Sequence, residues 1–236
     1  MEQNGGLQRT AQEIFEKLAP SYDSVLDYLT LYQDRYWKRF LLEEADLKRG
    51  LRVLDLACGT GLLEDRLLRR DCEVVGLDLT EKMIRVGRKR RGSGLASLLV
   101  GDAENIPFMD ESFDVVLSCY LPKYCRADRI AGEVRRVLRL GGRVLLYDFS
   151  RPRGFLGAFH AFYLYGVLRI LAAISRLASR ELEFTLTKLP EIIRESRWDE
   201  ELLEVMLSRG FSQVGKRVLT GGVITAVWGT RSPASS

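Results

Sequence analysis

The sequence R-V-L-D-L-A-C-G-T-G, residues 52–61, decides the fold. Residues 53–57 are apolar apart from Asp55, as expected for a central parallel strand that is covered on both faces. The chain then reaches Gly59 and Gly61, and glycines allow a sharp turn and a close approach of a ligand to the backbone amides. We therefore expect a strand, a tight turn and a helix from Leu62, which is the layout of a nucleotide-type site.

Two common nucleotide-binding motifs do not fit this turn. The dinucleotide fingerprint G-x-G-x-x-G needs a glycine where Glu64 stands, and the phosphate-binding loop needs G-K-[ST], which does not occur here. The sequence instead has an acid ahead of the glycines, in the form D-x-x-x-G-x-G from Asp55 to Gly61. This form resembles motif I of the class I S-adenosylmethionine-dependent methyltransferases.

Composition and charge narrow the class of protein. The chain has 236 residues and a formal net charge of +4, which fits one domain and gives no sign of nucleic-acid binding. Its four cysteines form no C-x-x-C pair, and His160 is the only histidine, so we expect no metal site. With no signal-peptide pattern at residue 1, we expect a cytoplasmic protein with reduced thiols.

Strand and helix patterns alternate through the middle of the chain. We expect strands at residues 51–57, 73–77, 96–100, 113–118 and 143–149, and helices at 62–69, from 80 onward, and at 127–138. Near the end, residues 212–219 and 223–228 form two strands joined by Thr220-Gly221-Gly222, which predicts a hairpin. The fold class is therefore α/β: a doubly wound, mostly parallel seven-stranded sheet, Rossmann-like as in methyltransferases, with an antiparallel C-terminal hairpin and a helical cap.

The chain forms a single methyltransferase domain, residues 1–236, in this interpretation. An N-terminal helical cap occupies residues 7–48, a helical lid or substrate insertion 151–195, and a tail 230–236. The first helix is expected to begin at Thr10, which with Glu13 fits a capping box, after a disordered stretch 1–6.

Polar residues follow four consecutive strands, and ligands bind at the carboxyl ends of strands in open α/β sheets. Asp78 is placed to accept bonds from ribose hydroxyls, Asp102 from the adenine amino group, and the Ala103 amide donates to the ring. Tyr22 in the cap can close over the cofactor, or serve as a partly exposed structural tyrosine. The expected cofactor-binding residues are Tyr22, Asp55, Ala57, Gly59, Thr60, Gly61, Asp78, Leu79, Met83, Asp102, Ala103, Ser118 and Tyr120.

The chain more narrowly resembles the ubiquinone/menaquinone biosynthesis C-methyltransferase family. The matching motifs are Tyr22-Asp23 with Trp37-Lys38, Gly101-Asp102-Ala103-Glu104, Arg136-Val137-Leu138-Arg139 with Gly141-Gly142, and Leu219-Thr220-Gly221-Gly222-Val223. The departures face the substrate: Leu26 and Asp34 replace Asn and His, Pro122-Lys123-Tyr124 replaces an Arg-Asn pair, Val227 replaces a late histidine, and Asp148 replaces a glutamate.

The resemblance implies methyl transfer from S-adenosylmethionine, with S-adenosylhomocysteine as product and no metal, to a small lipophilic acceptor. A prenylated quinone precursor, methylated on carbon, is the first expectation. Another small acceptor, such as a phospholipid amine, a thiol or a phenol, is the alternative, and so is an inactive cofactor-binding module. If the acceptor must lose a proton, the candidate bases are Asp148, His160, Tyr120 and Tyr124, and the sequence does not choose among them.

One apolar segment, residues 155–174, bears on the acceptor. It is too short to span a bilayer, which takes about 20 apolar residues. It is therefore either a lid helix packed on the sheet, or a wall for an apolar tail or an interfacial anchor with peripheral membrane contact through residues 155–180. His160 in this segment is either a packed histidine or a base at the mouth of the pocket.

Overall fold

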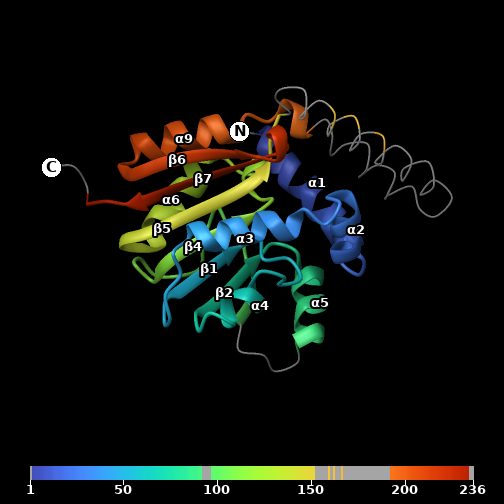
Figure 1. Ribbon diagram of the computed structural model, residues 1–236, viewed down its shortest axis with the longest axis horizontal. Helices are drawn as coiled ribbons and strands as arrows, with labels where there is room; N and C mark the ends of the chain where they lie inside the picture. The colour runs from blue at the N-terminus through green and yellow to red at the C-terminus, as the bar shows by residue number, and fades with distance from the viewer. Residues whose placement is uncertain are drawn as a thin grey trace.

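The structure, a computed structural model, describes residues 2–91, 97–151, 159, 162, 166 and 192–233, and for residues 2–7, 10 and 91 only the backbone. In the described part, one seven-stranded sheet has the strand order β3-β2-β1-β4-β5-β7-β6 (Figure 1). The strands are β1 (Arg52–Leu56), β2 (Glu73–Asp78), β3 (Ser97–Val100), β4 (Phe113–Cys119), β5 (Leu138–Phe149), β6 (Phe211–Leu219) and β7 (Ile224–Arg231). Strands β1 to β5 are parallel, and β7 is antiparallel to both β5 and β6. The expected doubly wound sheet with an antiparallel hairpin is confirmed.

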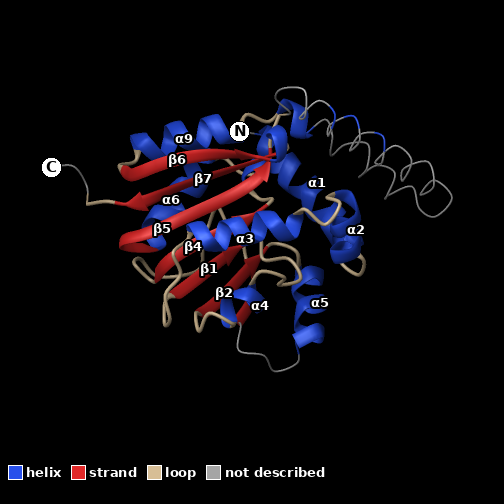
Figure 2. Cartoon of the chain, viewed as in Figure 1, coloured by secondary structure: helices blue, strands red, loops and turns tan. Residues whose placement is uncertain are grey.

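The sheet is covered by helices on both faces, as the helices and strands of Figure 2 show. Helices α3 (Asp34–Glu44) and α4 (Glu64–Leu68) pack on one face, and α6 (Ala127–Val137) and α9 (Trp198–Ser208) pack on the other. Side chains of β1 alternate between these layers: Val53 lies in the first core, while Leu54 and Leu56 lie in the second. This double burial explains the nearly continuous apolar run of β1.

The helical cap lies at the carboxyl ends of the parallel strands. Helices α1 (Glu2–Leu18) and α2 (Tyr22–Leu29) lie beyond the tip of the β5 arrow in Figure 1. The prediction that α1 begins at Thr10 after a disordered stretch was wrong, because the helix begins at Glu2. The helix contacts α5 (Glu81–Arg91) and the short 3-10 helix η1 (Pro122–Tyr124), and local capping signals do not reveal such tertiary contacts.

Strand boundaries differ from the prediction mainly at β5. The strand begins at Leu138, so Gly141 and Gly142 lie inside it at a register shift and do not precede it. The hairpin turn is the short 3-10 helix η2 (Thr220–Gly222), as expected from its two glycines. Strand β7 includes Thr230 and Arg231, the first two residues of the expected tail. Most of the expected lid, 151–195, lies outside the described residues, including His160 and nearly all of the apolar segment 155–174.

Candidate active site

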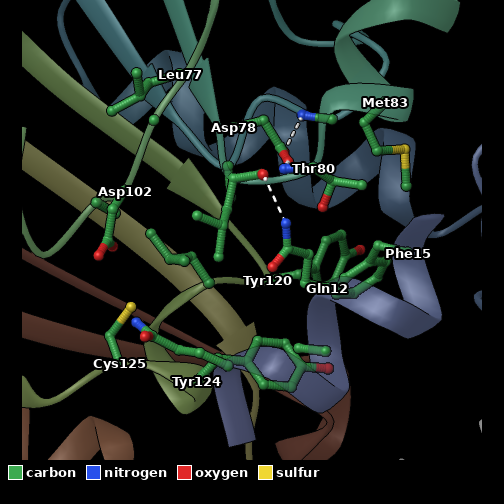
Figure 3. Close-up of a pocket in the computed structure, with 18 of the residues that line it drawn as sticks. Gln12, Phe15, Leu77, Asp78, Thr80, Met83, Asp102, Tyr120, Tyr124 and Cys125 are labelled. Carbon is green, nitrogen blue, oxygen red and sulfur yellow. Dashed lines mark hydrogen bonds between the residues drawn. The ribbon is translucent and has the colours of Figure 1, made fainter. Parts of the chain in front are cut away.

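A cavity opens at the carboxyl ends of β1, β2, β3 and β4, and the strand order reverses between β1 and β4. Figure 3 shows Gln12 and Phe15 reaching into it from α1, on the side opposite Asp102, with Tyr124 along one wall. Its lining residues come from the cap, from four strand ends and from α5: Gln8, Ala11, Gln12, Phe15, Tyr22, Ala57, Gly59, Leu77, Asp78, Leu79, Thr80, Met83, Gly101, Asp102, Ala103, Cys119, Tyr120, Leu121, Tyr124 and Cys125.

Two non-glycine residues at the rim of this cavity have left-handed backbones. Ala57 follows β1 with φ 55°, and Tyr120 follows β4 with φ 65°. This conformation costs an L-residue of order 1–2 kcal/mol and persists only where the surroundings enforce it. Gly59, with φ 58°, adopts the same conformation without that cost. The ends of the two strands that flank the switch point are therefore held in unusual geometry beside the cavity.

Asp78 at the end of β2 is ordered by backbone amides. Its Oδ2 accepts a hydrogen bond from Gly59 N at 2.8 Å, and its Oδ1 accepts one from Thr80 N at 2.7 Å. A carboxylate has about four lone-pair sites, so each oxygen can accept one further bond from a ligand. Burial raises the pKa of Asp78, and the two amides partly oppose that shift by stabilising the charged form. Asp78 can therefore accept bonds from a pair of ligand hydroxyls.

The third strand end adds a second acid to the cavity wall. Asp102 follows β3, and its Oδ1 accepts the Glu104 amide at 2.9 Å, which orders the turn that contains Ala103. On the opposite wall, Gln12 donates from Nε2 to the Leu79 carbonyl at 3.2 Å and so ties α1 to the end of β2. A flat ring placed here would lie between α1 and the turn after β3.

A smaller cavity adjoins the main one and shares part of its lining, including Tyr22, Gly59 and Tyr120. Asp55, Thr60 and Lys38 line this inner cavity and not the main one. Thr60 donates from Oγ1 to Asp23 Oδ1 at 2.5 Å, and Arg90 donates to Asp23 Oδ2 at 2.6 Å. These bonds fasten the start of α2 to the glycine turn and give Arg90, late in α5, a structural partner.

Most of the residues proposed to bind the cofactor line one of these two cavities. Two do not: Gly61, whose amide donates to the Cys58 carbonyl at 2.9 Å, and Ser118, which donates from Oγ to the Leu56 carbonyl at 2.6 Å. Ser118 is fully buried, and its hydrogen bond joins the adjacent strands β4 and β1.

The candidate bases lie in different surroundings. Tyr120 and Tyr124 line the main cavity, and burial raises the pKa of both phenols, so both are neutral at physiological pH. Tyr120 donates its hydroxyl to Asp34 Oδ1 at 2.7 Å. Asp148 does not line the cavity, is fully buried, and is ion-paired to Lys123 at 2.6 Å between Nζ and Oδ1. His160 lies outside the described residues.

The sequence prediction missed two sets of site residues. The first set comes from α1: Gln8, Ala11, Gln12 and Phe15. Their spacing of three or four residues marks one helix face, but only the three-dimensional structure shows that this face covers the cavity. The second set is Lys38 and Cys125, whose residue types carry no binding signal of their own.

The two cavities fit the groups of S-adenosylmethionine. Asp78 offers acceptors for ribose hydroxyls, and Asp102 and Ala103 offer an acceptor and an amide in the same cavity, which Leu79 and Met83 also line. The inner cavity has charged groups of both signs, Asp55 and Lys38, as a zwitterionic amino-acid end requires. Within the described residues, no group of three or more His, Cys, Asp or Glu is arranged to hold a metal ion.

Comparison with solved structures shows the same fold. Phosphoethanolamine N-methyltransferase 2 of Haemonchus contortus, in complex with S-adenosyl-L-methionine, aligns with a TM-score of 0.63 at 16% identity, over 84% of this chain and 53% of that one. Geranyl diphosphate C-methyltransferase of Streptomyces coelicolor A3(2), in complex with Mg²⁺, geranyl diphosphate and S-adenosyl-L-homocysteine, aligns with a TM-score of 0.61 at 16% identity, over 84% of this chain and 79% of that one.

Comparison of sequences gives the family. The chain is 33% identical over 221 residues to the ubiquinone/menaquinone biosynthesis C-methyltransferase UbiE of Idiomarina loihiensis, covering 90% of this chain and 86% of the relative. It is 34% identical over 212 residues to the demethylmenaquinone methyltransferase of Streptomyces avermitilis, covering 89% and 90%. The model of the ubiE/COQ5 methyltransferase family matches residues 3–231. Sequence, fold and cavity thus agree that this S-adenosylmethionine-dependent methyltransferase belongs to the ubiE/COQ5 methyltransferase family.

Proposed function

We propose that the enzyme transfers a methyl group from S-adenosylmethionine to a ring carbon of a lipophilic, prenylated quinone precursor. The names of its relatives support this reaction, since they include ubiquinone/menaquinone biosynthesis C-methyltransferases and demethylmenaquinone methyltransferases. The observation that contributes most from the structure is the division of the main cavity. Asp78 and Asp102 line the side proposed for the cofactor, Phe15 and Tyr124 form an aromatic wall, and Tyr22, beside Gly59, joins the two.

The aromatic wall suits a flat, apolar acceptor. The Phe15 ring packs edge-on against Tyr22 and Tyr124, with ring centroids 5.9 and 6.0 Å away. No Lys, Arg or His is among the described residues that line the main cavity, so this lining offers no cation to hold a phosphate group. That absence favours an uncharged ring over a phosphorylated acceptor such as those named for the two structural neighbours.

In this proposal the cofactor supplies a sulfonium methyl group, and the protein aligns it and excludes water. Asp78 holds the ribose, the turn of Asp102 and Ala103 holds the adenine, and Leu79 and Met83 pack on the ring. The glycine turn with Asp55 and Thr60 lies beside the amino-acid end. Tyr22 and Tyr120, which line both cavities, would flank the reacting methyl group.

Removal of a proton from the acceptor needs a base. The described candidate bases that line the main cavity are not ionised in the free enzyme. Tyr120 and Tyr124 are neutral phenols, because burial raises the pKa of each. We therefore propose that these two tyrosines orient the acceptor by hydrogen bonding or packing.

A methyl-transfer assay with labelled cofactor tests the acceptor. Demethylated naphthoquinols and benzoquinols would be supplied with tails of increasing length and without a tail, beside a phospholipid amine and a small thiol. We expect carbon-methylated quinol products, detected by mass spectrometry, and a KM that falls as the tail lengthens, since each buried methylene contributes about 0.8 kcal/mol. Turnover of tail-less or water-soluble acceptors alone would refute the lipophilic acceptor and leave the methyltransferase assignment intact.

A matched pair of variants locates the acceptor. Phe15→Ala removes part of the aromatic wall and should raise the KM for the quinol more than the Kd for S-adenosylhomocysteine. Tyr36→Ala removes an aromatic ring from the same cap at a position that is 56% exposed and lines neither cavity, and should change neither value. Equal effects of the two variants would contradict the proposed acceptor wall.

A further inference from the structure

The inner cavity contains an unusual side chain for its position. Lys38 lies one turn into α3 and is only 5% exposed, yet it borders the inner cavity. Among the described residues that line either cavity, Lys38 is the only basic one. Lysine is rarely buried without a partner or a function, because desolvating an ammonium group is costly.

The ammonium group of Lys38 is held in place by a buried network. It donates to Asp34 Oδ2 at 2.5 Å, and Asp34 Oδ1 accepts hydrogen bonds from the hydroxyls of Tyr120 at 2.7 Å and Tyr147 at 3.0 Å. Asp34 is 3% exposed. An ammonium group has three N–H donors, so the bond to Asp34 leaves two for another acceptor. The network therefore positions a cation at the wall of the inner cavity, and two N–H donors of this cation remain for a ligand.

The cofactor needs such a donor. Its amino-acid end has an α-carboxylate, and a buried carboxylate must be paired or hydrogen-bonded. Three polar groups of the glycine turn already have partners: the Gly59 amide donates to Asp78, the Gly61 amide to the Cys58 carbonyl, and the Thr60 hydroxyl to Asp23. The other charged groups that line the two cavities, Asp55, Asp78 and Asp102, are acids, which cannot donate to a carboxylate when ionised.

We propose that Lys38 donates to the α-carboxylate of the cofactor, whose amino-acid end lies beside the glycine turn, and that Asp34 is the positioning residue for Lys38. The inference rests on the proposed placement of the cofactor, with its ribose on Asp78, and it is independent of the acceptor. It also gives Asp34 a role. That residue departs from the family pattern, and its carboxylate fixes a cation that a neutral side chain would hold less firmly.

Calorimetry with two ligands tests the inference. S-adenosylhomocysteine has the α-carboxylate, and its decarboxylated analogue differs only in lacking that group. The wild-type protein should bind the analogue about ten- to hundredfold more weakly, as expected for loss of a charge-assisted hydrogen bond. Lys38→Met should weaken S-adenosylhomocysteine binding by a similar factor and leave analogue binding within about twofold. Lys38→Arg should restore part of the discrimination, because it restores the charge.

Lys48→Met is the matched control, since this lysine side chain is 76% exposed and lines neither cavity. It should leave both affinities unchanged. Equal losses for both ligands in Lys38→Met would show that Lys38 only supports the fold, and wild-type protein that binds both ligands equally would overturn the inference without any variant. If Lys38→Met does not fold, Lys38→Gln removes the charge and keeps a donor, and it should show the same selective loss. A wild-type protein that binds neither ligand would instead contradict the proposed cofactor site.

Discussion

Replacing Lys123 by methionine should strongly destabilise the protein, because it would strand a buried carboxylate. Lys123 Nζ lies 2.6 Å from Asp148 Oδ1, and their side chains are 2% and 0% exposed. Asp148 also accepts the backbone amides of Lys123 and Phe149, at 3.2 and 2.7 Å. In Lys123→Met the two amides remain, but the compensating charge is lost.

The expected loss follows from the burial of the pair. Breaking a buried ion pair by removing one partner costs about 3–5 kcal/mol, which is a large part of a typical stability of about 5–15 kcal/mol. For a chain of this size, each kcal/mol corresponds to about 2–4 °C in Tm, so the melting temperature should fall by roughly 6–20 °C. Methionine fills much of the volume of lysine, so the loss comes mainly from the uncompensated charge.

The loss should also depend on pH. Burial raises the pKa of Asp148, and Lys123 opposes that shift, so the pKa rises further when Lys123 is removed. A folded-state pKa above the unfolded value means that the folded protein binds the proton more tightly. The destabilisation should therefore be complete above the raised pKa of Asp148 and should shrink as the pH falls through it.

Urea unfolding followed by circular dichroism at neutral and mildly acidic pH measures both effects. The double variant Lys123→Met/Asp148→Asn should recover part of the loss, because it removes both charges and keeps an acceptor for the amides. Lys48→Met, which changes an exposed lysine, is the control for the substitution itself. The reasoning is refuted if Lys123→Met stays within about 1 kcal/mol of wild type, or if the double variant loses the full sum of the two single changes.

Two further predictions concern carboxylates whose pKa is shifted. Asp78→Asn should weaken S-adenosylhomocysteine binding about ten- to hundredfold in calorimetry. Burial raises the pKa of Asp78, so as the pH is lowered the wild-type affinity should begin to fall at a higher pH than it would if the site contained an aspartate of ordinary pKa. The asparagine variant should not show this fall in affinity. A fall of the same size in both proteins would exclude Asp78 as its source. Glu133 accepts bonds from the Ile106 amide and from Arg136, and the Arg136 hydrogen bond is the main cause of its lowered pKa. Glu133→Gln should cost about 1–3 kcal/mol in urea unfolding at neutral pH. Since the folded pKa lies below the unfolded one, that difference should vanish as the pH falls through the lowered pKa, and a difference that persists in acid would contradict the ion-pair explanation.

The sheet could be predicted from the sequence because burial on both faces leaves a simple pattern. The apolar run around Leu54 and the acids that end two strands place β1, β2 and β3 to within about two residues, the usual uncertainty of such boundaries. The start of β5 was misplaced because Gly141 and Gly142, which indicate a turn, lie within a strand at a register irregularity. A local signal cannot show that a neighbouring strand continues the pairing.

The cofactor side of the site was likewise accessible to sequence reasoning, because the fold brings strand ends together. The cap side was not. Gln12 and Phe15 look like ordinary positions on a helix, and their place over the cavity depends on how α1 packs against α5 and η1. The bond from Tyr120 to Asp34 joins residues 86 positions apart, which no periodicity reveals. Lys38 and Asp34, four residues apart on one helix, would pass for a surface ion pair.

The position of β7 inside the sheet has a consequence for how the molecule is made. This strand follows β6 in the chain but separates β5 from β6 in the sheet, and it pairs Arg143 with Thr230. During synthesis at about 5–20 residues per second, the open edge of β5 therefore waits several seconds for the strand that covers it. Strand β6 is made only shortly before β7, so the edge of β5 stays unpaired for most of that interval, and an unpaired apolar edge is a template for association with other chains. A nascent chain halted before residue 224 would hold an almost complete cofactor crevice beside an exposed strand edge, and would be a substrate for chaperones or proteases before it could act as an enzyme.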